Sequence, residues 1–205
     1  MENYADLMFH EAVAELQKQE GTYEKYKTFY PHRRQDQLSE NDIAFLQDRE
    51  SIYIASTTPD GWPYIQHRGG PRGFLKVMGE NRIACADYRG NQQFITMGNL
   101  KGDDRVSVFC MDYMNRARLK IQGRATLVSR EDADADLLAL VDSAELPAER
   151  VLVIDIVAMD WNCPQYIPQL LPAEVVQGVV AQKLGALQAE NEALKAELET
   201  NPKLS

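Results

Sequence analysis

The sequence predicts a mainly β, α+β fold in which an antiparallel sheet closes into a barrel. Short runs rich in β-branched and aromatic residues recur from residue 51 to residue 159, and such runs are typical of strands. Turn signals such as Pro59-Asp60-Gly61 separate several of them. Only two short helical segments interrupt the series, too few for the regular β-α alternation of a doubly wound sheet.

The N-terminal region predicts helices. Apolar residues from Tyr4 to Lys18 fall close to helical spacing, and Gly21 ends that pattern. Residues 22–38 have no clear period, so no element is predicted there. Ser39 is an N-cap residue type, and Asp42 three residues later predicts a capping box at the start of a short helix.

The strands begin with a hairpin, in which "SIYIAST" and "WPYIQ" flank the turn at Pro59-Asp60-Gly61. Five further runs predict strands: "FLKVM", "RIACAD", "RVSVFCM", "RLKIQGRATLV" and "RVLVIDIVAM". The two intervening helices are predicted over 91–100, with Asn91 as N-cap, and over 131–141.

Composition bounds the function classes. A chain of 205 residues with a formal net charge of −9 favours one acidic domain with a tail, not a general nucleic-acid binder. Three scattered cysteines suit reduced thiols, no apolar run approaches membrane-spanning length, and the N-terminus lacks a secretory pattern. We therefore expect a cytoplasmic protein without nucleic-acid or membrane partners.

The charge is unevenly spread. Residues 62–124 hold eleven Lys and Arg against five Asp and Glu, a net of +6 within an acidic chain. Such a basic segment suggests a small anionic ligand. The alternative is that these arginines only decorate solvated strand edges.

The stretch "QHRGGPRG" (66–73) lies in this basic segment. Two adjacent glycines let a backbone approach a ligand closely, and Arg68 and Arg72 offer forked donors suited to phosphate. The spacing matches neither a P-loop nor a GxGxxG turn, and a bulged hairpin is the structural alternative. His67 alone supports no acid–base role.

Two further elements point to an anion. Arg89 and Gly90 precede the helix that Asn91 is predicted to cap, a favourable place for phosphate, although an ordinary strand-to-helix turn would look the same. Arg116, Arg118 and Lys120 would share one strand face, where salt bridges to a neighbouring strand are the alternative.

No nucleophilic triad, paired-carboxylate site or HExxH metal motif is present in the sequence. If the protein is an enzyme, its chemistry belongs to a bound cofactor.

The C-terminal segment carries a heptad pattern. Its seam consists of Val180, Leu184, Leu187, Asn191, Leu194 and Leu198. An asparagine at an a position, with Glu190 at g and Lys195 at the following e, favours a parallel two-stranded coiled coil. An amphipathic helix lying on its own domain is the alternative, and Gly185 weakens the helix by ~1 kcal/mol.

The run from "FLQDRESIYIASTTPDGWPYIQHRGGPRGFLKV" through "RIACADYRGNQQFITMGNL" to "RLKIQGRATLV" and "WNCPQYIP" resembles the pyridoxamine 5′-phosphate oxidase-related, FMN-binding split-barrel family, in particular its branch of predicted flavin-nucleotide-binding proteins. The resemblance implies a six-stranded Greek-key split barrel that forms a homodimer with two FMN molecules between the subunits. It divides the chain into a helical leader (1–37), the barrel (38–168) and a helical tail (169–205).

The resemblance also implies cofactor contacts. The strand along the flavin ring would supply Gln66, His67, Arg68 and Gly69, and the phosphate turn would supply Asp87, Asn91 and Gln92. Arg118 would contact flavin from the barrel wall, and Trp161 and Asn162 would close the site from a C-terminal segment. The family's oxidase has an Arg-Lys pair where Asn91 and Gln92 stand, so charge neutralisation would fall to Arg68, Arg89 or Arg118.

The implied function is an FMN-dependent oxidoreductase acting on an unidentified small molecule. Oxidation of vitamin B6 is not expected, because the oxidase's C-terminal segment for substrate recognition is not recognisable. A non-catalytic flavin carrier or sensor is one alternative. A haem- or F420-binding split barrel is another, with His67 as the one histidine of residues 38–168.

Overall fold

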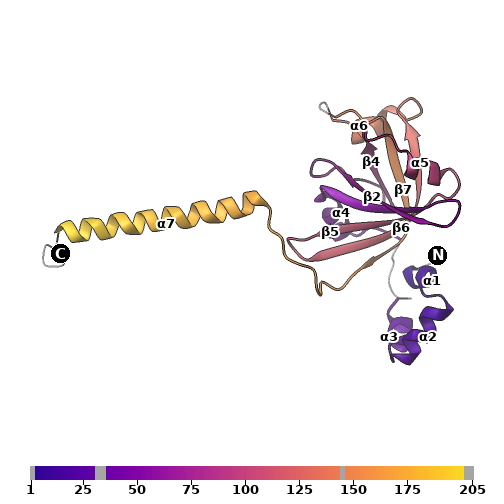
Figure 1. The fold of residues 1–205 in the computed structure, drawn as a ribbon, viewed down its shortest axis with the longest axis horizontal. Coiled ribbons are helices and arrows are strands. Elements are labelled where there is room, and N and C mark those ends of the chain that lie inside the picture. The colour runs from indigo at the N-terminus through magenta and orange to yellow at the C-terminus, as the bar shows by residue number, and fades with distance from the viewer. Residues whose placement is uncertain (1–2, 31–35, 144–145, 201–205) are drawn as a thin grey trace. The chain divides into compact units, whose positions relative to one another are not determined.

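A computed structural model describes residues 3–30, 36–143 and 146–200, which form a seven-stranded antiparallel sheet (Figure 1). The strand order is β2-β1-β5-β6-β7-β4-β3. The strands are β1 (Ser51–Thr57), β2 (Pro63–Gly69), β3 (Lys76–Met78), β4 (Arg82–Asp87), β5 (Arg105–Asp112), β6 (Ala117–Ser129) and β7 (Arg150–Trp161). The predicted mainly β, split-barrel fold is confirmed, and each of the seven predicted runs forms a strand. The short edge strand β3 brings the total to seven where the resemblance implies six.

The main apolar core is formed by the inward-facing side chains of the strands. Inward side chains alternate with outward ones along β1 and β5, as a half-buried strand requires. The inward positions are closed to solvent: Ile52, Ile54, Val108, Leu119, Ile121, Leu152 and Ile154 are each at most 1% exposed. Helix α4 (Glu40–Gln47) adds Leu46 to this core.

The predicted hairpin is confirmed and fixes which residues face the core. Strand β2 pairs with β1 from Ser51 opposite Gly69 to Thr57 opposite Pro63. Gly61 has φ of +84°, the left-handed backbone that a glycine adopts without strain. Because side chains alternate, Gln66 and Arg68 share one face of β2, while His67 takes the other.

The capping box at the start of α4 is also confirmed. The Ser39 side chain accepts from the Asp42 amide, and the Asp42 carboxylate accepts from the Ser39 amide at 2.8 Å. The box orients the short helix over the core, where the Trp161 indole N–H donates to Asp42 Oδ1 at 2.7 Å.

The N-terminal helices differ from the prediction. The expected helix over Tyr4–Lys18 is two helices, α1 (Tyr4–Met8) and α2 (Glu11–Gln19), and a further helix, α3 (Tyr23–Phe29), occupies a stretch for which no element was predicted. The break falls at Phe9 because its ring packs edge-on against Tyr26 and Tyr30, with centroids 5.8 and 5.2 Å apart. An aromatic cluster therefore overrides the local helical period.

Helix α6 (Ala135–Val141) is shorter than the predicted helix over 131–141. Its N-cap is Asp134, whose Oδ1 accepts from the Leu137 backbone amide at 2.7 Å. Residues 131–134 therefore remain outside the helix. Val141 packs with Ala84, Ala86 and Val151 in a second apolar cluster against β4 and β7.

The chain forms two compact units. The first comprises Met1–Asp112 and Ala117–Gln165, and the second comprises Tyr113–Arg116 and Tyr166–Ser205. Within the second unit, the Leu170 amide donates to the Tyr113 carbonyl at 3.3 Å, ahead of the long helix α7 (Ala173–Thr200). Among the described residues, no helix has the length and apolarity needed to cross a membrane.

The register of β6 against β7 shifts between Gln122 and Gly123, and this irregularity yields a stability prediction. A Cβ at Gly123 would lie 2.7 Å from Ile154 Cγ2 and 2.8 Å from the Asp155 carbonyl oxygen, which are both impossible contacts without movement. We expect Gly123→Ala to lower the free energy of unfolding by about 1–3 kcal/mol, measured by urea denaturation.

Gly98→Ala is the matched control, because a Cβ at this position in α5 (Ile95–Leu100) meets nothing within 4 Å. Alanine has the higher helix propensity, so this variant should be as stable as the parent or more stable by up to about 1 kcal/mol. Equal stability of Gly123→Ala and the parent would contradict the close packing at the shift.

Candidate functional site

A polar cavity of about 70 Å³ lies where β2, the end of β4 and the start of β7 meet the loop that leads into α5. Its size suits a small polyatomic group rather than a whole aromatic ring system. Its lining comprises Tyr64, Gln66, Arg68, Asp87, Tyr88, Gly90, Asn91, Gln92, Gln93, Phe94, Ile95, Thr96, Met97, Leu127 and Arg150.

Two arginines share one carboxylate in this lining. The Arg68 guanidinium Nη1 donates to Asp87 Oδ1, and Arg150 Nε donates to Asp87 Oδ2 at 2.6 Å. The three side chains are 14%, 20% and 11% exposed for Arg68, Arg150 and Asp87, so the group is mostly removed from water. Arg150 Nη2 also donates to Glu149 Oε2 at 3.1 Å, but Glu149 lies outside the lining. Within the lining, two cations stand against one anion, which favours an anionic ligand.

The register of the sheet places these groups together. Asp87 and Arg150 are directly paired residues of β4 and β7, while Arg68 comes from the far end of the hairpin strand β2. The Arg68 Nε is buried and has no hydrogen-bond partner among the described residues. A buried donor of this kind is costly unless a ligand or water accepts from it.

The loop from Tyr88 to Phe94 corrects the prediction that Asn91 caps a helix. Helix α5 begins at Ile95, and its N-cap position is Phe94. Asn91 Oδ1 instead accepts from the Gln93 amide at 3.2 Å, a local turn that competes with helix formation. Gln92 and Phe94 follow with φ of +60° and +55°. Arg89 and Gly90 therefore do not directly precede the helix.

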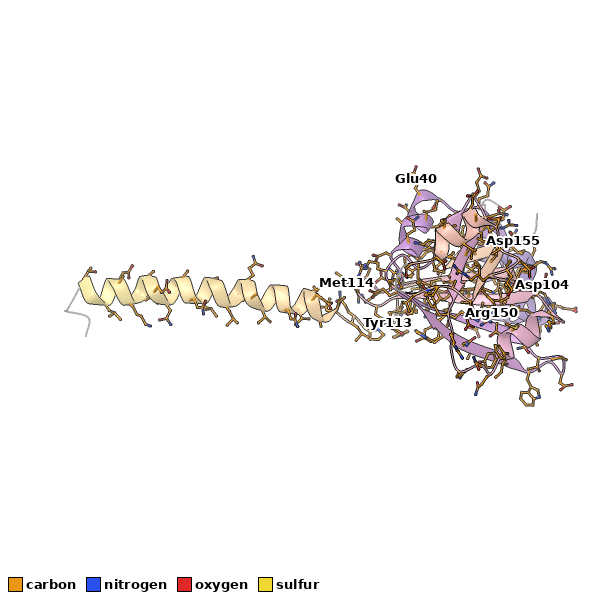
Figure 2. All side chains as sticks on the ribbon, turned by 90° about the horizontal axis from the view of Figure 1, so that it is seen from above. Glu40, Asp104, Tyr113, Met114, Arg150 and Asp155 are labelled. Carbon is orange, nitrogen blue, oxygen red and sulfur yellow. The ribbon has the colours of Figure 1, made fainter. Side chains whose placement is uncertain are left out.

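Side-chain hydrogen bonds fix α5 over the cavity. The Thr96 hydroxyl donates to Gln66 Oε1 at 2.8 Å, and the Asn99 amide donates to the Ser56 hydroxyl at 2.9 Å. The first bond orients the Gln66 amide by its oxygen, so its N–H groups remain for a ligand. The Phe94 ring lies 5.7 Å from the Arg150 guanidinium and covers the cation (Arg150 is labelled in Figure 2).

The cavity unites five of the residues predicted to bind the cofactor: Gln66, Arg68, Asp87, Asn91 and Gln92. His67, Gly69 and Arg89 do not line it. His67 lies edge-on to Tyr53, with ring centroids 5.7 Å apart, and a Cβ at Gly69 would lie 3.0 Å from the Glu50 carbonyl. The Arg89 side chain is 76% exposed.

The other predicted residues, Arg118, Trp161 and Asn162, form a separate group where β6 and β7 meet. The Asn162 backbone N–H donates to the Arg118 backbone carbonyl at 3.2 Å. The Trp161 ring packs edge-on against Phe45, with ring centroids 4.6 Å apart. Arg118 Nε and Asn162 Oδ1 are buried without a hydrogen-bond partner among the described residues. These two atoms could therefore hydrogen-bond to a ligand, but the group does not line the cavity.

The predicted cationic face of Arg116, Arg118 and Lys120 is not formed. Strand β6 begins at Ala117, and Arg116 lies in the preceding turn with φ of +52°. Lys120 pairs with Asp160 at 3.5 Å, so the salt-bridge alternative is correct for that residue.

Sequence reasoning missed Arg150, Phe94 and Thr96. Arg150 is the first residue of "RVLVIDIVAM", and its polar head at a strand start was a weak signal. Only the pairing of β4 with β7 places it opposite Asp87, and that register joins residues 63 positions apart.

Thiol and metal chemistry find no support at this site. Cys85 and Cys110 are buried in the core, and burial raises the pKa of each thiol to about 12, which keeps it protonated and unreactive. The described residues contain no group of three or more His, Cys, Asp or Glu that could hold a metal ion. The two arginines and the buried, unpartnered Arg68 Nε give the cavity the chemistry of anion recognition.

Solved structures with a similar arrangement include a putative pyridoxamine 5′-phosphate oxidase from Lactobacillus delbrueckii, with 15% identity and a TM-score of 0.48 over 61% of this chain and 94% of that one. A pyridoxamine 5′-phosphate oxidase-related, FMN-binding protein from Nostoc punctiforme has 14% identity and a TM-score of 0.40 over 55% and 73%. An F420 reductase has 19% identity and a TM-score of 0.44 over 60% and 98%.

Comparison with curated proteins found no match. The model of the pyridoxamine 5′-phosphate oxidase family matches residues 38–163, a span that includes all seven strands and the whole lining of the cavity. The chain belongs to the pyridoxamine 5′-phosphate oxidase family.

Proposed function

We propose that the protein is an FMN-binding flavoprotein, and that it works as a cytoplasmic, homodimeric oxidoreductase on a small molecule. The observation that carries the proposal is the pair of arginines, Arg68 and Arg150, held by one buried carboxylate in the floor of a phosphate-sized cavity. Family membership supports a flavin as the group that bears the phosphate.

The residues fit a flavin phosphate. Arg68 and Arg150 would bind it with charge-assisted hydrogen bonds, including one from the unpartnered Arg68 Nε. Asp87 would act as a positioning residue, because it contacts both guanidinium groups and fixes their separation. Gln66, Asn91 and Gln92 line the same cavity and add polar contacts. Of the three arginines expected to neutralise the phosphate, Arg68, Arg89 and Arg118, only Arg68 lines the cavity, and Arg150 would share this role with it.

The flavin ring would extend beyond this cavity, which is too small to enclose it. Arg118, Trp161 and Asn162 would then contact the ring from the second copy of the chain. The buried, unpartnered Arg118 Nε and Asn162 Oδ1 support a role for that group in binding. When bound, FMN supplies the electron- or hydride-transfer chemistry. This chain orients it and contributes donors, and no residue is assigned as acid or base.

The test measures FMN binding by the purified protein through the quenching of flavin fluorescence. Riboflavin is the comparison ligand. We expect Arg150→Gln and Arg68→Gln each to weaken FMN binding by about ten- to hundredfold, because each loses a charge-assisted contact worth about 1–3 kcal/mol. Riboflavin, which lacks the phosphate, should lose far less. Arg89→Gln is the matched control, since that side chain is exposed and lies outside the cavity lining.

Equal affinity for FMN and riboflavin in the parent protein would overturn the phosphate assignment. Thermal denaturation of each variant identifies any loss that comes from unfolding alone.

A non-catalytic flavin carrier or sensor is distinguished from an oxidoreductase by turnover. An oxidoreductase reduces its flavin with NAD(P)H and reoxidises it over many cycles, whereas a carrier holds flavin that never cycles. Haem ligation by His67 receives no support, because that residue does not line the cavity.

A further inference from the structure

Helix α7 is a long helix whose described side chains are uncovered. It runs from Ala173 to Thr200, and every residue from Val176 to Leu198 is exposed. Figure 2 shows side chains of this helix projecting from both edges of the ribbon. Five leucines and valines of the heptad seam are each between 48% and 60% exposed: Val180, Leu184, Leu187, Leu194 and Leu198. So much exposed apolar surface along one stripe is typical of a docking face.

Most of the stability of a helix in a protein comes from packing of its apolar face against a neighbour. Gly178 and Gly185 both lie in its interior, and each costs about 1 kcal/mol of helix stability relative to alanine. The helix therefore needs a partner that covers its apolar stripe.

We propose that the partner is α7 of a second copy of this chain, in a parallel, in-register, two-stranded coiled coil. The seam steps alternate between four and three residues, which places Leu184, Asn191 and Leu198 at a and Val180, Leu187 and Leu194 at d. Both glycines then fall at b, away from the contact, where a Cβ would meet nothing within 4 Å.

Asn191 selects the parallel arrangement. In a parallel pair in register, the two Asn191 side chains meet and hydrogen-bond to each other. An antiparallel pair sets a positions against d positions, so Asn191 would be buried against a leucine with no polar partner, at a cost in stability.

The charges beside the seam agree with this choice. Glu190 at g precedes Lys195 at e by five residues, the offset at which g and e residues of two parallel helices meet. Two-fold symmetry forms this attractive pair twice. The inference uses α7 alone, so it stands or fails independently of flavin binding.

The experiment is cysteine cross-linking in the full chain. A Cys163→Ser background removes the exposed thiol, and Cys85 and Cys110 are buried. We expect Asn191→Cys and, separately, Val180→Cys to form covalent dimers under mild oxidation at least about tenfold faster than the controls. The controls are Val179→Cys and Ala193→Cys, both at c positions outside the seam.

Val179 and Val180 form the sharpest comparison, since they are neighbours with 49% and 48% exposure and differ only in their place relative to the seam. Equal cross-linking at both would indicate tails that are merely close, and would overturn the proposal. An antiparallel pair sets residue 191 of one helix against a d position of the other, so slow cross-linking at both residue 191 and residue 180 would indicate an antiparallel pair or another partner. Fast cross-linking at only one of the two residues would indicate a different register. Both results overturn it as well.

A second set of variants tests the seam without a cysteine at its centre. Leu187→Glu with Leu194→Glu, combined with Val180→Cys, should abolish the fast cross-link. Ala186→Glu with Ala193→Glu adds the same charge at c positions and should leave it intact. If both doubles behave alike, the apolar seam is not the contact.

Discussion

Asp87→Asn is expected to lower the stability of the fold and, at the same time, to strengthen the response of the folded protein to phosphate-bearing ligands. The carboxylate is 11% exposed and contacts both Arg68 and Arg150. Removing the anion takes the carboxylate partner from Arg68 and leaves Arg150 with Glu149 alone, in a mostly desolvated site. Breaking a buried ion pair costs ~3–5 kcal/mol. Because these groups are partly exposed, we expect a loss of about 3 kcal/mol in the free energy of unfolding.

The opposite sign for ligand binding follows from the same charges. The summed charge of the side chains that line the cavity rises from +1 to +2 when Asp87 becomes neutral, so FMN or inorganic phosphate replaces the missing anion. Urea denaturation with and without each ligand measures both effects. The free energy of unfolding should fall without ligand, and the stabilisation at a fixed ligand concentration should exceed that of the parent protein.

Asp155→Asn is the matched control. Asp155 pairs with Arg82 at 2.5 Å, but the two side chains are 46% and 47% exposed. Exposed pairs contribute about 0–1 kcal/mol, so this variant should be nearly as stable as the parent. A similar small loss for Asp87→Asn would show that Asp87 does not hold the two arginines. A weaker ligand response would contradict the expected gain, and would show that the positioning of the arginines by Asp87 outweighs the effect of its negative charge.

Local patterns in the sequence were sufficient to predict the sheet. The β1–β2 hairpin depends on period-two alternation and a turn of three residues, and the cap at Ser39 depends on a partner three residues away. Each of these signals is complete within a few residues. Such local signals do not depend on how distant parts of the chain pack, so the elements that they predict are the ones that form.

The candidate site was only partly predictable, because its charges come from distant strands. Arg68 and Asp87 were named from the sequence and a resemblance, but Arg150 reaches Asp87 through the β4–β7 register. No local pattern encodes which residue of one strand lies opposite which residue of another. Arg150, the second cation of the site, could therefore be identified only from the pairing of β4 with β7.

The prediction that Asn91 caps α5 was wrong for a different reason. Asn91 is a favourable N-cap residue type, and it does accept a backbone hydrogen bond, but from Gln93 within a turn. Asparagine side chains make both kinds of bond, and the sequence alone does not choose between them. The left-handed backbone at Gln92 and Phe94 then delays the helix to Ile95.

Arg49→Leu is the second variant for which we expect a large effect. Arg49 connects α4 to the end of β5: its Nε donates to the Phe45 carbonyl and its Nη1 to the Met111 carbonyl, both at 3.0 Å. Its Nη2 donates to the Asp112 carboxylate at 2.9 Å, and both side chains of that pair are 8% exposed. Leucine removes the cation and every donor while it keeps much of the apolar volume.

We expect Arg49→Leu to lower the free energy of unfolding by about 3–5 kcal/mol, because it breaks a buried ion pair and takes a donor from two backbone carbonyls. Arg49→Lys keeps the charge without the planar fork, so it should recover only part of this loss. Arg72→Leu is the control: Arg72 contacts Asp48, as Arg49 does, but its side chain is 61% exposed and should contribute less than about 1 kcal/mol. Urea denaturation of the three variants measures these differences in the free energy of unfolding. If Arg49→Leu is no less stable than Arg72→Leu, then apolar contacts, and not this hydrogen-bonded cation, attach α4 to the barrel.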